Sequence, residues 1–143
     1  SFVSNSEFYT VFIPSDEALD AYDINSLSKE ELRKFLMTHI IQGDIIFTDG
    51  NKSAGYYETT RIDERSTQYS TVYTQLYVEP GIDVIRFKDK EGSVYAEVNE
   101  SEGTNQLTGV NIGEGQQIFN NVYNNAVIHE IDTVLLYNEL DTK

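Results

Sequence analysis

Two histidines, His39 and His129, are the residues of this 143-residue chain best suited to acid–base chemistry or metal binding. A zinc site would need further ligands, such as Asp44 or Glu130, and no H-E-x-x-H spacing is present. A hydrolase would need a nucleophile in a motif that a histidine could activate, and the sequence offers none. We therefore expect each histidine to form a hydrogen bond inside the core, and we predict no catalytic residue, cofactor or metal site.

The acidic residues raise the possibility of a calcium loop. Such a loop needs oxygen ligands at alternate positions and a glycine, as in D-x-[DN]-x-[DN]-G. Asp83, Asp89 and Glu91 do not have this spacing, and Asp49–Asn51 lacks the rest of the motif. The acids are expected to form a solvated, charged surface instead.

Tyrosines are concentrated in the middle of the chain, among Thr, Ser, Gln and Asn residues. A tyrosine combines a rigid apolar ring with a hydroxyl group, which suits contacts with proteins or sugars. Tyr73 and Tyr77 would share one face of a strand if that segment is extended. The alternative is that these are ordinary half-buried strand aromatics. The possible binding surface comprises Tyr56, Tyr57, Tyr69, Tyr73, Tyr77 and Tyr95.

The overall charge excludes several classes of partner. Ten Lys and Arg residues against 24 Asp and Glu residues give a formal net charge of −14. Nucleic acids and anionic lipid surfaces both bind proteins through clusters of Lys and Arg residues, so neither is an expected partner. The sequence has no cysteine, and no apolar run approaches the roughly 20 residues of a membrane span, so direct membrane insertion is not expected. With 39% hydrophobic residues the chain should nevertheless form a core.

Two elements near the beginning of the chain have clear boundaries. The β-branched and aromatic run Tyr9–Ile13 predicts a strand that Pro14 ends. Ser15 is a typical N-cap for a short helix that follows. A second helix begins with a capping box formed by Ser28 and Glu31.

The second helix is predicted to end at Gly43, which can adopt a left-handed conformation. Its buried face is expected to consist of Leu32, Phe35, Leu36, His39 and Ile40. Further strands are predicted over Ile45–Phe47, Thr71–Val78, Asp83–Phe87, Ser93–Val98, Leu107–Ile112, Ala126–Ile131 and Thr133–Tyr137. No linker or repeat interrupts them, so residues 1–143 are expected to form one domain.

Three segments of the chain resemble a known family. Thr10–Leu19 resembles the first signature of the fasciclin-like (FAS1) domain, and Phe35–Gly43 resembles its central helix. Asn125–Leu136 resembles its closing signature. The three occur in family order. Family members usually carry helical sequence before the first signature, so we expect either a piece of a longer protein or an altered amino-terminal lobe. The stretch between Gly50 and Gln106 is longer than usual, so we expect extra strands or a long loop there.

The resemblance implies an α+β fold, a compact FAS1-like β-sandwich wedge with helices packed at one edge. It also implies that His39, His129, Pro14 and Gly43 are structural. The implied function is a non-enzymatic adhesion or binding module that acts through contacts with a surface or matrix protein. Its implied location is extracytoplasmic, meaning the cell surface, the periplasm or the secreted state. A glycan-binding module that uses the tyrosine-rich middle is the alternative.

Integrin binding and glycosylation are two further properties that the sequence addresses. Some members of the family bind integrins through a Tyr-His pair and an Asp-Ile pair. Here the tyrosine position holds Thr38 and the Asp-Ile position holds Asn120–Asn121, so integrin binding is not expected.

Asn51 and Asn99 each begin an N-x-[ST] triplet, which is a glycosylation acceptor only where a secretory pathway supplies the sugar.

Overall fold

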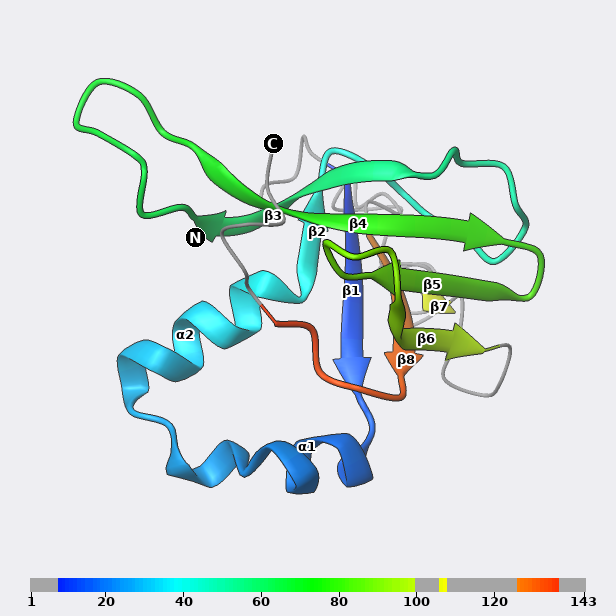
Figure 1. Cartoon of the computed structure of the whole chain (residues 1–143), viewed down its shortest axis with the longest axis horizontal. Helices are drawn as coiled ribbons and strands as arrows, with labels where there is room; N and C mark the ends of the chain where they lie inside the picture. The colour runs from blue at the N-terminus through cyan, green and yellow to red at the C-terminus, as the bar shows by residue number, and fades with distance from the viewer. Residues whose placement is uncertain (1–7, 100–105, 108–125, 137–143) are drawn as a thin grey trace, which may run out of the picture.

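The fold was analysed in a computed structural model, which describes residues 8–99, 106–107 and 126–136. Two α-helices lie together at one end of the molecule, and a strongly curved sheet makes up the rest (Figure 1). The elements in chain order are β1 (Tyr9–Pro14), α1 (Asp16–Tyr22), the 3-10 helix η1 (Ile24–Ser26), α2 (Lys29–Thr38), β2 (Ile40–Gln42), β3 (Gly55–Ile62), β4 (Tyr73–Gly81), β5 (Val84–Lys88), β6 (Val94–Asn99), β7 (Gln106–Leu107) and β8 (Ala126–Ile131).

The eight described strands form a single sheet in the order β6-β5-β4-β3-β2-β1-β8-β7. The β1 and β8 pair is parallel, and the other neighbours are antiparallel. The sheet curls until β6 reaches the end of β8, where Asp132 N donates to Glu97 O at 3.1 Å and Glu97 N donates to Asp132 Oδ1 at 2.8 Å. The mixed α and β composition is confirmed, but the strand order describes one nearly closed sheet and does not establish a two-sheet sandwich.

The main core fills the inside of this curled sheet. Phe12 lies at its centre, with its ring edge-on to Phe87 at 4.9 Å and stacked on His129 at 5.6 Å. Because alternate strand residues point to opposite faces, every second residue of the central strands is buried. The fully or nearly buried members are Phe12, Ile41, Ile46, Leu76, Val78, Ile85, Phe87, Ala96, Val98, Ile131 and Leu135.

Local sequence signals explain the helix starts. Ser15 caps α1 by accepting a hydrogen bond from Ala18 N at 3.2 Å. Ser28 and Glu31 form the predicted capping box, with Ser28 N donating to Glu31 Oε1 at 2.8 Å. The pKa of Glu31 is lowered, mainly because its carboxylate accepts this backbone hydrogen bond. Both predicted helix starts are therefore confirmed.

The predicted end of the second helix is wrong, and so are two members of its predicted buried face. Phe35, His39 and Ile40 are buried, as predicted. The helix ends at Thr38, with His39 as its C-cap, and Gly43, at φ +94°, follows β2 instead. Leu32 and Leu36 are 36% and 52% exposed. They line an apolar groove of about 330 Å³ between α1, α2 and β1, because the helix turns its Phe35, Met37 and Thr38 side toward the sheet.

Two predicted strands are absent from the described residues. Ile45–Phe47 is an irregular segment, because Ile46 N donates to the side chain of Thr10 at 3.0 Å rather than to a neighbouring strand. Residues 133–136 also lack strand pairing, and Leu135 N donates to a histidine ring. Side-chain acceptors thus replace the backbone acceptors that a sheet would supply. Tyr137 and residues 108–112 of the strand predicted over Leu107–Ile112 lie outside the described residues.

The long middle of the chain contains extra strands, as expected. The strands predicted over Asp83–Phe87 and Ser93–Val98 are confirmed as β5 and β6, which pair in an antiparallel hairpin. Strand β3 was not predicted, because its pattern is broken by a bulge between Glu58 and Ile62 in which Thr59 and Thr60 are both buried. Strand β4 continues past its predicted end, through Pro80 to Gly81.

Candidate binding surface

His39 joins the end of α2 to the segment that follows β8. Leu135 N, which can only donate, lies 2.9 Å from Nε2, so Nε2 is the acceptor and the ring proton is on Nδ1. Nδ1 donates to Phe35 O at 2.8 Å. Burial lowers the pKa of His39 to about 4, against a smaller opposing effect of the Phe35 carbonyl. The ring is therefore neutral at physiological pH, and both of its nitrogens are used in backbone hydrogen bonds.

His129 performs a similar task in the sheet. Its Nε2 donates to Ile46 O at 2.6 Å, which ties the irregular segment after β2 to β8. Burial lowers the pKa of His129 as well. The described residues contain no group of three or more His, Asp or Glu side chains that could hold a metal ion. Both histidines are thus placed where they connect segments of the chain, and neither faces an acidic ligand cluster.

The remaining residues singled out in the sequence lie in several parts of the fold. Pro14 is the last residue of β1 and pairs with Ile131. Thr38, which occupies the position of the integrin-binding tyrosine, is buried and donates to Lys34 O at 2.9 Å. Asn120–Asn121 lies outside the described residues. Asn51 is exposed in a turn, where its Nδ2 donates to Asp49 Oδ2 at 2.9 Å.

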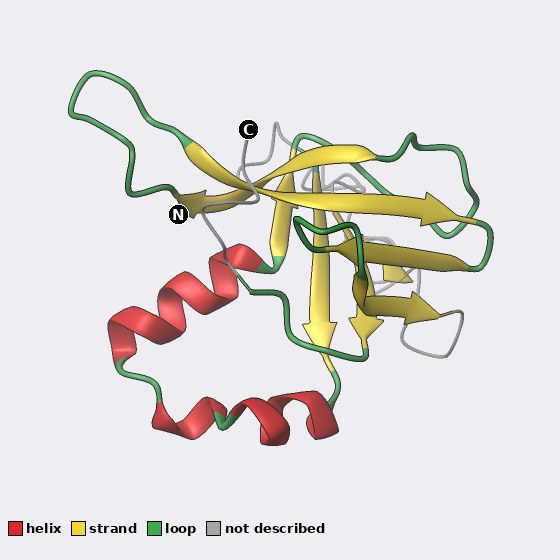
Figure 2. Ribbon diagram, viewed as in Figure 1, coloured by secondary structure: helices red, strands yellow, loops and turns green. Residues whose placement is uncertain are grey.

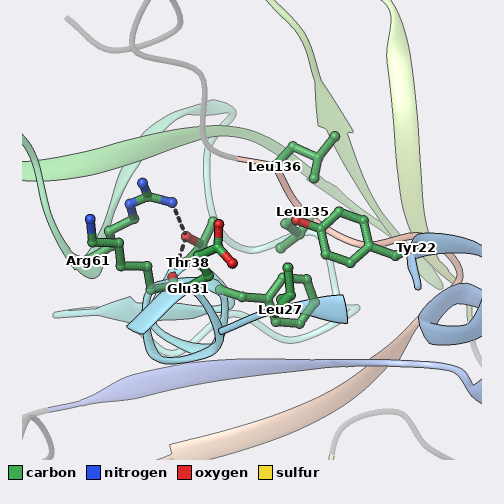
Figure 3. A pocket seen from close by; sticks show the side chains of 9 residues that line it. Tyr22, Leu27, Glu31, Thr38, Arg61, Leu135 and Leu136 are labelled. Carbon is green, nitrogen blue, oxygen red and sulfur yellow. Dashed lines mark hydrogen bonds between the residues drawn. The ribbon is translucent and has the colours of Figure 1, made fainter. Parts of the chain in front are cut away.

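A small pocket of about 170 Å³ lies beside α2 (Figure 3). Its apolar wall includes Tyr22, Leu27 and Leu135, and its polar wall includes Glu31 and Arg61. The guanidinium of Arg61 reaches toward Thr38, whose Oγ1 accepts a hydrogen bond at 3.4 Å. No histidine lines the pocket, and the Glu31 carboxylate already accepts the Ser28 N–H of the capping box.

The structure places three of the six predicted tyrosines on one face of the sheet and brings two of them into contact. Tyr56 on β3 lies directly opposite Tyr77 on β4, and their rings meet edge-on at 5.1 Å. Tyr73 lies four residues before Tyr77 on the same face of β4, where it pairs with Ile62. We call Tyr56, Tyr73 and Tyr77 the tyrosine face. It lies on the outer side of the sheet, opposite the buried Leu76 and Val78.

The other three tyrosines lie elsewhere. Tyr57 and Tyr95 are half-buried and pack against the main core, so they point away from the tyrosine face. The hydroxyl of Tyr57 donates to Ser53 O at 2.5 Å, and burial raises the pKa of Tyr57. Tyr69 is 89% exposed in the loop between β3 and β4, which projects from the body of the molecule (Figure 2).

The projecting loop is held by its own hydrogen bonds. Asp63, whose side chain is fully buried, accepts from Arg65 Nε at 3.0 Å and from Arg65 Nη2 at 2.9 Å. The pKa of Asp63 is lowered, chiefly by these hydrogen bonds from Arg65. Ser66 Oγ donates to Val72 O and accepts from Val72 N, both at 2.8 Å. These contacts close the base of the loop and hold Tyr69 outward, so we call residues 63–72 the hairpin tip.

The family of the chain follows from its sequence and agrees with this architecture. The family model named Fasciclin domain matches residues 2–137. The chain belongs to the fasciclin family. Comparison with curated proteins gives no match.

Membership of the fasciclin family confirms the resemblance of the three signatures. Fasciclin domains are generally non-enzymatic adhesion modules, typically extracellular or surface-associated. None of the helices in the described part of this fasciclin chain is long and apolar enough to cross a membrane. The signatures and the tyrosine face lie in different parts of the fold. The signatures cover β1, the start of α1, the end of α2, β2 and β8, whereas the face lies on β3 and β4.

Sequence reasoning missed residues that shape these surfaces. Asp63 and Arg65 close the hairpin tip, and Gln75 lies between two tyrosines on β4. One signal was available in the sequence, because residues 66–78 contain no charged side chain in a chain of which 24% is charged. A long uncharged run rich in Tyr, Thr, Ser and Gln is typical of a contact surface.

Proposed function

We propose that this fasciclin domain is a non-enzymatic binding module that acts outside the cytoplasm by contact with a surface or matrix protein. The observation that supports the proposal best is the hairpin tip, which holds Tyr69 outward with 89% of its surface exposed. Family membership supports an adhesion-related role. Both buried histidines are engaged by backbone groups, which leaves the surface as the part of the molecule that can act on others.

The tip has the properties of a protein-contact loop. Its base is fixed by the Asp63 and Arg65 ion pair and by the Ser66 and Val72 hydrogen bonds, so little conformational entropy is lost when it binds. Tyr69 adds a large, rigid ring with only two rotatable side-chain bonds. Thr67 Oγ1 accepts from Tyr69 N at 3.2 Å and thereby orders the turn that carries the ring. This arrangement fits a partner that has a shallow apolar pocket.

Charge also favours a protein partner that is neutral or basic. The chain carries a formal charge of −14, so long-range attraction would accelerate its encounter with a basic surface. The outer part of the tip, residues 66–72, carries no charge. An uncharged tip can be buried in an interface without the cost of desolvating an ion.

A binding array of purified surface and matrix proteins tests the proposal. We expect at least one protein to bind, and Tyr69→Ala to weaken that binding by about 30-fold, as for an aromatic hot spot. Thr71→Ala, an exposed neighbour in the same loop, is the matched control and should leave the affinity within about twofold. Absence of any binder, or a binder that is indifferent to Tyr69→Ala, would contradict the proposal.

A further inference from the structure

The outer face of β4 alternates aromatic and polar side chains. Thr74, Leu76 and Val78 point inward and are buried. The residues between them are half-buried and belong to the outer face; they are Tyr73, Gln75, Tyr77 and Glu79. The amide of Gln75 thus lies between the two tyrosine rings, and the carboxylate of Glu79 follows Tyr77. At about 3.3 Å per residue, the two tyrosine positions are roughly 13 Å apart along the strand.

Neighbouring strands widen this face. Strand β3 places Tyr56 beside Tyr77 and Glu58 beside Gln75. Strand β5 places Lys88 on the other side of Tyr77 and Arg86 beside Glu79. The Tyr77 end of the tyrosine face is therefore flanked by groups that donate or accept hydrogen bonds, whereas Tyr73 lies beside the exposed Ile62.

Both cations on this face are paired with carboxylates. Lys88 Nζ lies 3.2 Å from Glu79 Oε2, and Arg86 Nε lies 3.0 Å from Glu97 Oε2. The Glu58 carboxylate accepts from Gln42 Nε2 at 3.2 Å. The face offers no excess of cations to an acidic ligand, and the rest of the chain, with its net charge of −14, would repel one.

We propose that the tyrosine face, together with Gln75 and Glu79, is a binding site for a neutral, extended oligosaccharide. Pyranose rings have an apolar face of C–H groups, which packs against an aromatic ring, and a rim of hydroxyl groups, which need donors and acceptors. Tyr73 and Tyr77 supply the rings at separate positions along the strand, and between them lies the Gln75 amide, a group with two N–H donors and an acceptor oxygen. The distance between the rings requires a chain of several sugars.

The site is distinct from the hairpin tip, so it adds a second ligand class to the proposed function. Tyr69 is not on the sheet face, and Tyr73 and Tyr77 are not in the projecting loop. Loss of sugar binding and loss of protein binding are therefore expected from different substitutions, and either proposal can fail while the other holds.

Isothermal titration calorimetry with defined hexasaccharides tests the site on the full 143-residue chain. The neutral probes are cellohexaose, xylohexaose, mannohexaose and maltohexaose, and the acidic probes are a hexagalacturonate and a heparin hexasaccharide. We expect measurable binding of at least one neutral hexasaccharide and weaker binding of both acidic ones. No binding of any neutral probe, or tighter binding of an acidic probe, would overturn the proposal.

Substitutions then locate the binding. Tyr77→Ala should weaken the affinity for the neutral hexasaccharide about tenfold, because one stacking surface is lost, whereas Tyr77→Phe should retain most of it. Gln75→Ala should weaken it severalfold without removing a ring, which provides a second variant if Tyr77→Ala folds poorly. Tyr69→Ala is the matched control and should bind as the wild type does. Equal losses for Tyr69→Ala and Tyr77→Ala would overturn the assignment to this face.

Discussion

The histidine positions and the tyrosine surface differ in nearly every physical respect. His39 is 3% exposed, and each of its ring nitrogens has a backbone partner. Tyr69 is 89% exposed at the end of a projecting loop. Histidine is the more versatile group chemically, yet here it connects segments of the fold, while Tyr69 and the tyrosine face lie on the surface that a ligand can reach.

This difference shows why residue type alone does not identify a functional site. A buried, neutral imidazole with two fixed partners has no free nitrogen with which to take a proton from a substrate. An exposed tyrosine such as Tyr69 contributes little to folding and presents its ring to other molecules. Substitutions should therefore change stability at the histidines and binding at the tyrosines.

The largest effect is expected for His39→Ala. This change removes an acceptor from Leu135 N and a donor from Phe35 O, and it leaves a cavity next to the Phe35 ring, 4.5 Å away. We expect the free energy of unfolding to fall by about 3 kcal/mol. Urea denaturation measures it, with the exposed Leu36→Ala on the same helix as control. An unchanged midpoint for His39→Ala would show that the ring does not hold the fold together.

The pH dependence of stability is the next largest effect. Burial places the folded pKa of His39 at about 4, below its ordinary value of 6.5, so the unfolded chain binds the proton first as the pH falls. The free energy of unfolding should have its full value above about pH 6.5 and should be lower by about 3 kcal/mol at pH 4. The lowered pKa of His129 acts in the same direction. Urea denaturation from pH 7 to pH 4.5 should show a shallower decrease for His39→Gln, and an identical decrease in both proteins would contradict the account.

A smaller effect is expected at the base of the hairpin tip. Asp63→Asn removes the charge that Arg65 neutralises and one of the acceptors that hold the loop. Because the Arg65 side chain is 47% exposed, solvent screens the pair, and we expect a loss of about 1–2 kcal/mol. Hydrogen exchange of the Val72 amide should become faster, which would show that the loop has loosened. Glu64→Gln is the exposed control, and equal exchange rates in the two variants would rule out this role for Asp63.

The features of this fold that the sequence could predict depend on residues that are close together in the chain. The capping box of Ser28 and Glu31 depends on residues three apart, so it is visible without knowledge of the fold. The irregular segment at Ile46 depends instead on a hydrogen bond to Thr10, 36 residues earlier in the chain. Such a contact exists only after β1 and the segment after β2 have come together. The strand prediction there failed for this reason.

The candidate surfaces were predictable in part. The alternation of side chains along a strand correctly predicts that Tyr73 and Tyr77 share a face, because this alternation follows from strand geometry alone. It could not indicate that Tyr56 lies beside Tyr77, because that depends on the register of β3 and β4. Helical periodicity failed for Leu36, because the pattern shows an apolar stripe but not whether another element covers it.

Urea denaturation of the Tyr69→Ala Tyr77→Ala double variant is the most direct test of the separation between stability and binding. If the tyrosines serve contacts with other molecules, the free energy of unfolding should stay within about 1.5 kcal/mol of the wild type, with the same dependence on urea. Most of that change should come from Tyr77, which is half-buried against Tyr56. A loss as large as that of His39→Ala would contradict the account, since the tyrosines would then be part of what holds the fold together.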